Sequence, residues 1–271
     1  MRLSVRHTTR YDYSTESRYA VQRLRLTPRD NRAQSVLDWA IDAPGIEAAP
    51  SYIDGFGNLV HLLAHVEAYD SITITASGTV ETTESGGVLG QLDEAVNPIL
   101  FLRPTRLTAS SDGISALARE IGASDGGGDP IALLHGLLAA IEERVVYETD
   151  TTDAGTSAAA AFAAGYGVCQ DHAHIFIAAA RALGIPARYV TGYLHVTQDG
   201  PQTANHAWAE ANIRDLGWTG FDPANRVCPT AHYVRIACGF DANSAAPVTG
   251  TRRGGGDESL EVDVVVEQQQ Q

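Results

Sequence analysis

The chain has 271 residues, of which 44% are hydrophobic, and such a chain can bury a large core in one or two domains. Its formal net charge of −14 argues against nucleic acid and anionic membranes as partners, because both are negatively charged. The sequence contains no run of about 18 apolar residues, so we expect no membrane-spanning helix.

The cysteine and lysine content bears on the cell compartment and on the possible acyl acceptors. Three cysteines, an odd number, favour free thiols in a reducing compartment. The N-terminus lacks the apolar stretch of a secretory signal, so we predict a cytoplasmic protein. The chain contains no lysine, and it therefore cannot supply a lysine amine as acyl acceptor in self-cross-linking.

Residues 1–95 are predicted to form an antiparallel β-domain. Apolar and polar residues alternate from Leu3 to His7, and residues 71–75 form a period-two run rich in β-branched side chains. Residues 54–58, with the sequence DGFGN, are a turn signal between two apolar runs and predict a hairpin.

A connection and a helical pattern follow. Residues 97–107 contain two prolines, and we predict that residues 96–271 form a second domain, the catalytic core. A helix is predicted from Asp112 onward. After a glycine-rich break at residues 126–128, Asp129 stands at an N-cap position, with proline next to it at the first position of another predicted helix.

Cys169 stands at the start of a third predicted helix. Residues 168–183 favour helix, and Gly184 and Pro186 end it. In the first turn, free N–H groups and the helix dipole favour a thiolate, which is the reactive nucleophile. The same N–H groups could hold an oxyanion. An isolated cysteine is more often a packing residue of the core. The interpretation of Cys169 as a nucleophile therefore depends on catalytic partners elsewhere in the chain.

Two further residues complete a catalytic set. His206 opens an alternating run in which Trp208 and Glu210 share its face, while alanines on the other face are expected to pack against a helix. The polar face is expected to line a cleft. A second short strand, residues 218–221, ends at Asp222, and pairing of the two strands would bring Asp222 to His206. Cys169 as nucleophile, His206 as base and acid, and Asp222 as orienting carboxylate indicate cysteine acyl transfer.

A metal site is the competing interpretation of the cysteine segment. Cys169, His172 and His174 have the spacing C-x2-H-x-H, but two residues apart on a helix the histidines point about 200° apart. They cannot all reach one ion, so we expect no metal. His172, about one turn after Cys169, is expected to line the cleft. Cys228 and Cys238 have no neighbouring base and are predicted to be structural.

With these residues in view, the chain resembles the bacterial transglutaminase-like cysteine protease family. The resemblance is carried by residues 167–174 (GVCQDHAH), 182–190 (ALGIPARYV), 206–210 (HAWAE) and 217–223 (GWTGFDP), and it extends to residues 24–29 and 253–256. It implies an α+β fold: an N-terminal antiparallel β-domain, then a papain-like core in which a helix bearing Cys169 packs on an antiparallel sheet bearing His206 and Asp222.

The resemblance also implies how the reaction proceeds. Nothing matches the calcium sites of animal transglutaminases, so we expect no cofactor. Val168 and Gln170 stand where those enzymes have a tryptophan beside the nucleophile, which favours water over an amine as acceptor. We therefore expect a peptidase or amidase acting on a peptide or protein amide, with transamidation second.

Two rival functions stay open at this point. One is a catalytically silent binding module that keeps the fold, and the weaker one is a metalloenzyme. Residues 197–204 and 241–250 are candidate cleft walls, but their chemistry names no substrate. The sequence carries no signal for the oligomeric state.

Overall fold

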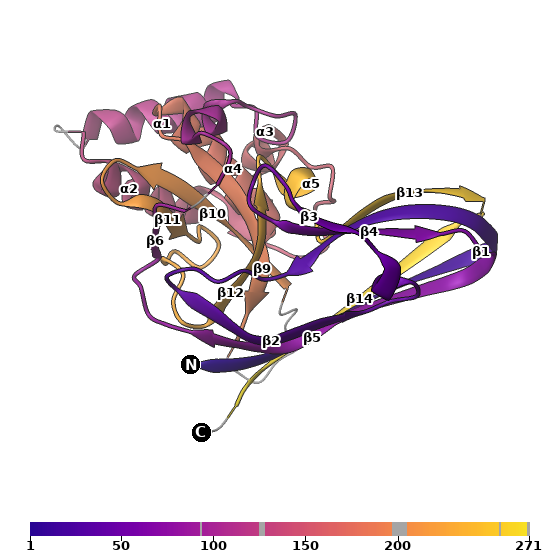
Figure 1. Ribbon diagram of the computed structural model, residues 1–271. Helices are drawn as coiled ribbons and strands as arrows, with labels where there is room; N and C mark the ends of the chain where they lie inside the picture. The colour runs from indigo at the N-terminus through magenta and orange to yellow at the C-terminus, as the bar shows by residue number, and fades with distance from the viewer. Residues whose placement is uncertain (93, 125–127, 197–204, 255, 270–271) are drawn as a thin grey trace.

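The computed structural model describes residues 1–92, 94–124, 128–196, 205–254 and 256–269. It consists of a long, curved β-sheet beside a second, smaller sheet that is covered on one face by helices (Figure 1). The predicted α+β fold is confirmed. The predicted glycine break at residues 126–128 lies almost wholly outside the described residues, and the candidate wall at residues 197–204 lies entirely outside them.

The first sheet is built around one strand. Its strands are β1 (Arg2–Thr27), β2 (Gln34–Asp42), β3 (Ser51–Ile53), β4 (Leu59–His65), β5 (Tyr69–Thr82), β13 (Val248–Gly254) and β14 (Glu258–Gln268). β1 pairs with β5 and β14 through its first half and with β4 and β13 through its second half, always antiparallel. Its alternating apolar residues face the interior, so the predicted short strand at residues 3–7 is the start of a far longer one.

The predicted hairpin at residues 54–58 joins β3 to β4. Asp54 Oδ1 accepts hydrogen bonds from the backbone N–H groups of Phe56 and Asn58, both at 3.0 Å, and Gly57 adopts φ 82°. Asp54 thus closes the turn through its side chain, and the strands on either side pair antiparallel.

The last strands of the chain belong to the first sheet. Residues 248–268 were expected in the catalytic part with the rest of 96–271, but β13 and β14 hydrogen-bond to β1. Residues 88–90 (β6), from the other side of the expected boundary, pair with the core sheet. The alternation of apolar and polar residues in β13 and β14 does not show which sheet they join. Their pairing with a strand that is distant in the sequence decides it. The division at residue 95 stays a prediction.

The second sheet has the order β12-β9-β10-β11-β6. Its strands are β6 (Val88–Gly90), β9 (Ala187–Leu194), β10 (Asn205–Ile213), β11 (Gly217–Phe221) and β12 (Tyr233–Gly239), and a small parallel pair is formed by β7 (Val146–Tyr147) and β8 (Tyr166–Gly167). Two short 3-10 helices, η1 (Ile46–Ala48) and η2 (Pro98–Leu102), lie in connections.

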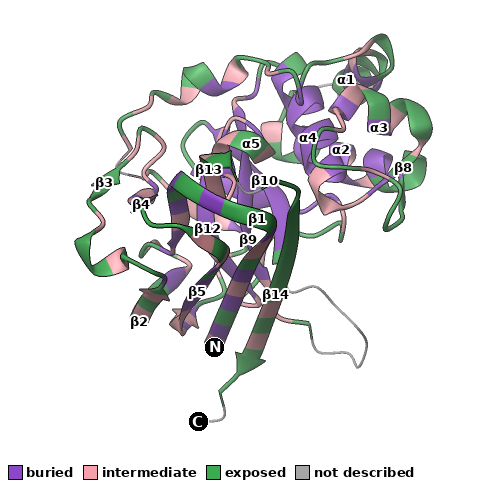
Figure 2. Cartoon of the chain, turned by 90° about the vertical axis from the view of Figure 1, so that its right-hand side faces the viewer, coloured by how far each residue is buried: buried purple, intermediate pink, exposed green. Residues whose placement is uncertain are grey.

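Helices cover one face of this second sheet. They are α1 (Asp112–Ser124), α2 (Pro130–Arg144), α3 (Ala158–Ala164), α4 (Cys169–Ala182) and the short α5 (Ala242–Ala245). α4 is the central one and is buried along most of its length (Figure 2). The alanines of β10 pack into its hydrophobic core, as predicted. Asp129 caps α2 by accepting from the N–H of Ile131 at 3.1 Å, which confirms the predicted helix start.

The opposite face of the second sheet carries a buried ion cluster. Glu210 on β10 accepts from Arg188 Nε on β9 and from Arg235 Nε on β12, each at 2.7 Å. Burial raises the pKa of Glu210, but the two guanidinium groups outweigh it and hold the pKa below its usual value. This face was expected to line a cleft. Instead Trp208 and Glu210 are buried, because the first sheet and its loops cover them.

Gln34 joins the two sheets directly. Its side-chain amide donates to the backbone oxygen of Arg235 at 2.9 Å and accepts from the backbone N–H of Arg235 at 2.8 Å. On the first strand, His7 Nδ1 lies 2.8 Å from the hydroxyl of Tyr193 on β9. These contacts fix the first sheet against the ion cluster.

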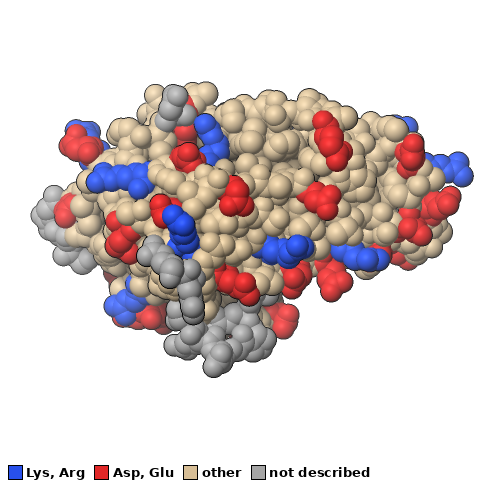
Figure 3. All heavy atoms as spheres, turned by 60° about the horizontal axis from the view of Figure 1, so that its bottom comes forward, with Lys and Arg blue, Asp and Glu red and all other residues tan. Residues whose placement is uncertain are grey.

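The last two features concern the length of the helices and the charges on the surface. Within the described residues, no helix is long and apolar enough to cross a membrane. On the face shown in Figure 3, arginines and carboxylates are interspersed. A cytoplasmic location stays a prediction.

The ion cluster predicts a large effect of one substitution. Glu210→Gln removes the carboxylate that two buried guanidinium groups share. Arg188 keeps Glu94, but Arg235 is left without an ion-pair partner among the described residues, so the free energy of unfolding should fall by about 3–5 kcal/mol. Glu142→Gln is the matched control, because Glu142 pairs with Arg226 at the surface and should cost about 1 kcal/mol or less. Urea unfolding measures both. Equal effects would contradict a structural role for the cluster.

His7 predicts a pH dependence of stability. Burial lowers the pKa of His7 to about 4, although the charge of Asp263 opposes this. Below pH 6.5 the unfolded chain binds a proton that the folded chain does not, so stability should fall as the pH drops from 6.5 to about 4. In His7→Gln this fall should be smaller by up to about 3 kcal/mol. Urea unfolding across this range would refute the idea if wild type and variant lost stability in parallel.

Candidate active site

The first turn of α4 presents the Cys169 thiol. The helix begins at Cys169 itself, as predicted, and Gly184 (φ 78°) follows its end. Cys169 is a partly exposed free cysteine. A Cβ atom at Gly167 would lie 2.7 Å from the side chain of Asp171, so the approach to the helix requires glycine.

The side chain of Asp171 stabilises this turn by accepting two hydrogen bonds. Its Oδ2 accepts from the backbone N–H of Val168 at 2.9 Å and from the hydroxyl of Thr152 at 2.6 Å. The carboxylate therefore caps the helix and ties down the connection that follows β7. The role of Asp171 was not predicted, although its spacing from the helix start is typical of a capping residue and could have indicated it.

His206 and Asp222 meet as predicted. β10 and β11 pair antiparallel through Ala209↔Phe221, which brings the residue after β11 beside the start of β10. His206 Nε2 donates to Asp222 Oδ2 at 2.6 Å. Both side chains are buried.

Asp222 receives several other hydrogen bonds. Tyr233 Oη and Asn225 Nδ2 each donate to Oδ2 at 2.7 Å, and the backbone N–H groups of Ala224 and Asn225 donate to Oδ1 at 3.0 and 3.2 Å. Burial raises the pKa of Asp222, but these bonds and the His206 charge outweigh it and lower the pKa. The carboxylate is thus held ionised against the imidazole ring.

His206 links Asp222 to Cys169. Burial lowers the pKa of His206, but hydrogen bonds to Asp222 and Cys169, together with the charges of both, raise it to about 10. Since Nε2 faces Asp222, the other ring nitrogen is left for the thiol. The structure therefore brings the three predicted residues together in the order Cys169, His206, Asp222, with the imidazole ring between the thiol and the carboxylate.

The histidines of α4 do not converge with Cys169. His172 is buried, with Nδ1 2.9 Å from the oxygen of Val168 and Nε2 3.1 Å from the oxygen of Val145. The expectation that it lines the cleft is therefore wrong, because backbone carbonyl groups hold both of its nitrogens. His174 Nε2 accepts from the N–H of Ala242 at 3.1 Å. Burial lowers the pKa of His174 to about 4.

With this geometry established, comparison with known proteins places the chain. Residues 115–223 match the family described as "Transglutaminase-like superfamily", and residues 3–81 match "Bacterial transglutaminase-like N-terminal region". An uncharacterized protein of Mycobacterium leprae is 30% identical over 98% of both chains. The chain belongs to the transglutaminase-like superfamily.

Two further relatives are informative about this superfamily member. An uncharacterized protein of Mycobacterium tuberculosis is 28% identical, over 92% of this chain and 87% of its own. A solved structure, the "Putative Cysteine Protease" of Cytophaga hutchinsonii, is 27% identical, has a TM-score of 0.75 and covers 100% of this chain and 92% of its own. The transglutaminase-like match at residues 115–223 contains Cys169, His206 and Asp222.

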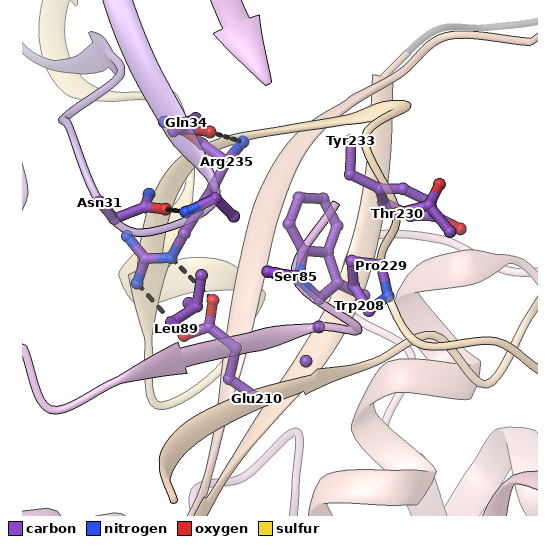
Figure 4. Close-up of a pocket in the computed structure, with 13 residues that line it drawn as sticks. Asn31, Gln34, Ser85, Leu89, Trp208, Glu210, Pro229, Thr230, Tyr233 and Arg235 are labelled. Carbon is purple, nitrogen blue, oxygen red and sulfur yellow. Dashed lines mark hydrogen bonds and ion pairs between the residues drawn. The ribbon is translucent and has the colours of Figure 1, made fainter. Parts of the chain in front are cut away.

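A small pocket lies behind the site of this transglutaminase-like core. Trp208 stacks on His206 with ring centroids 6.3 Å apart, and Tyr233 meets Trp208 edge-on at 5.5 Å. Figure 4 shows the Trp208 ring between Tyr233 and the Glu210–Arg235 ion pair, with Gln34 of the first sheet beside Arg235. The free volume of about 30 Å³ holds water more readily than a substrate side chain. We regard it as packing space that supports the site.

The two other cysteines and residues 241–250, the second candidate cleft wall, lie in other parts of the structure. Cys238 is buried and its thiol donates to the oxygen of Phe56 at 3.5 Å, and burial raises the pKa of both Cys228 and Cys238. Residues 241–250 form α5 and the start of β13.

Tyr233 and Asn225, which donate hydrogen bonds to Asp222, were not predicted from the sequence. Asn225 follows Asp222 by three residues, a turn pattern that could have signalled it, whereas nothing in the sequence singled out Tyr233.

The Asp222 hydrogen bond predicts the titration of His206. In Asp222→Asn the charge that favours the imidazolium is lost, so the pKa of His206 should fall from about 10 toward 6.5. The protonated ring stabilises the wild-type fold fully below pH 6.5, and this stabilisation is lost as the pH rises through about 10. NMR titration of the ring nitrogens measures the shift, with Tyr233→Phe as a milder comparison. An unchanged His206 titration in Asp222→Asn would contradict the assignment.

Proposed function

We propose that this protein is a cysteine-dependent amide hydrolase that works through a thioester acyl-enzyme. The observation that carries the proposal is the position of His206, whose ring bonds to Asp222 on one side and to Cys169 on the other. A thiolate and an imidazolium held together in this way are the starting state of a cysteine nucleophile. Supporting the proposal, the solved relative with the same overall fold is described as a putative cysteine protease.

The first half of the reaction forms the thioester. Cys169 Sγ attacks the carbonyl carbon of a peptide or protein amide, and the electron pair of the C=O bond moves to oxygen. The backbone N–H of Cys169, at the helix start, lies where it can stabilise this oxyanion. When the C–N bond breaks, His206 gives its proton to the leaving nitrogen, which departs as a neutral amine.

The second half releases the acyl group. A water molecule loses a proton to His206 and attacks the thioester carbonyl, and the C–S bond breaks to restore the thiolate. Asp222 keeps the ring oriented through both steps and stabilises its protonated form. Water is favoured over an amine because Val168 and Gln170, not tryptophans, flank the nucleophile. Transamidation is the second outcome, and any amine acceptor must then come from a different molecule.

Alkylation of the three cysteines tests the activated thiolate. With iodoacetamide near neutral pH, Cys169 should be labelled much faster than Cys228 and Cys238, whose pKa values are raised by burial. His206→Ala should remove this advantage, because the imidazolium that favours the thiolate is gone. Peptide mass spectrometry measures all three sites in one sample, so Cys228 and Cys238 are internal controls.

Cleavage of a mixed peptide library gives the functional test. Wild type should release new peptide termini and Cys169→Ser should not, with added glycine ethyl ester reporting any transamidation. Slow labelling of Cys169 that His206→Ala leaves unchanged would argue instead for a catalytically silent binding module. Wild-type cleavage by Cys169→Ser would exclude the proposed nucleophile.

A further inference from the structure

The oxyanion in the proposed reaction needs a second donor. The N–H groups of Asp171 and His172 are taken up by the oxygen of Val168, at 3.0 and 3.1 Å, and that of Val168 by Asp171. Within the described residues, this leaves Cys169 and Gln170 with free N–H groups in the first turn. Oxyanion sites usually combine such a backbone donor with another donor from a different segment.

Tyr147 lies next to this turn on a separate strand. In the parallel pair β7–β8, Tyr147 stands opposite Gly167, two residues before the nucleophile. The N–H groups of Val146 and Glu148 donate to the oxygens of Gly165 and Gly167 at 2.8 and 3.0 Å. The backbone of Tyr147 is thereby fixed against the segment that leads into α4.

The ring of Tyr147 lies near the ring of His172 in α4. Its centroid lies 6.0 Å from that of His172, about one turn beyond Cys169. The side chain is half exposed, and its hydroxyl makes no hydrogen bond among the described residues. A phenol with a free hydroxyl, on a strand paired with the segment that leads into Cys169, can donate a hydrogen bond to a group that arrives from solution.

We propose that the Tyr147 hydroxyl is the second oxyanion donor of this site, a catalytic residue that acts with the backbone N–H of Cys169. The inference rests on the proposed function, which supplies the oxyanion. When Cys169 Sγ bonds to the carbonyl carbon, the negative charge on oxygen accepts a hydrogen bond from Tyr147, and the proton stays on the phenol. When the C=O bond re-forms and the leaving group departs, that bond weakens again.

The electrostatics agree with a donor role. Burial, with the charges of Cys169 and Asp222, raises the pKa of Tyr147. The phenol therefore keeps its proton throughout the neutral range, as a hydrogen-bond donor must. Its sensitivity to both charges also indicates that the ring lies within electrostatic reach of the nucleophile and of the orienting carboxylate.

Two reagents separate an oxyanion role from a general effect on the thiol. Acetylation of Cys169 by 4-nitrophenyl acetate passes through an oxyanion, whereas alkylation by iodoacetamide does not. In Tyr147→Phe, acetylation should slow on the order of 10²-fold, while alkylation should keep the wild-type rate. Release of 4-nitrophenolate and the mass of the Cys169 peptide measure the two rates.

Tyr166→Phe is the matched control. Tyr166 lies on the neighbouring strand β8 and is also partly exposed, so the same loss of a hydroxyl there should change neither rate. Acetylation of Tyr147→Phe at the wild-type rate, or an equal slowing of both reactions, would overturn the Tyr147 assignment alone. No acetylation of Cys169 in wild type would overturn the proposed function and the Tyr147 assignment with it.

Discussion

The buried carboxylate of Glu210 lies at the centre of an ion cluster on the face of the core sheet opposite α4. It joins three strands, because Arg188 and Arg235 reach it from β9 and β12 while Glu210 itself stands on β10. Charges removed from water in this way need all their partners in place. The first sheet and its loops supply the cover, and Gln34 bonds to the backbone beside Arg235. The N-terminal sheet is therefore part of what makes the core sheet stable.

The same strand connects this cluster to the chemistry. Along β10 the side chains alternate, so the alanines meet α4 and the other set, His206, Trp208 and Glu210, lies on the opposite face. Anchoring Glu210 fixes the register and rotation of the strand. Trp208 lies between Glu210 and His206 on this face and stacks on the imidazole ring, so it limits the positions that the ring can take.

Local signals explain which parts could be predicted from the sequence. The start of α4 at Cys169, its end at Gly184, the cap at Asp129 and the pairing that brings Asp222 to His206 depend on residues close together in the chain. The burial of Glu210, the Tyr233 bond to Asp222 and the pairing of β14 with β1 depend on contacts between distant segments. Alternation shows that a strand has two faces, but it does not show what covers each of them.

The central position of β1 has a consequence for how the protein folds. β1 precedes the other described strands in sequence, yet two of its partners, residues 248–254 and 258–268, lie more than two hundred residues further along the chain. Closing loops of more than two hundred residues makes such pairing slow compared with local helix formation. Until then, β1 exposes an edge whose backbone groups are open to other chains. The segment from α4 to β12 can fold before that edge is covered, so we expect the pairing of β1 with β13 and β14 to be the slow step of folding.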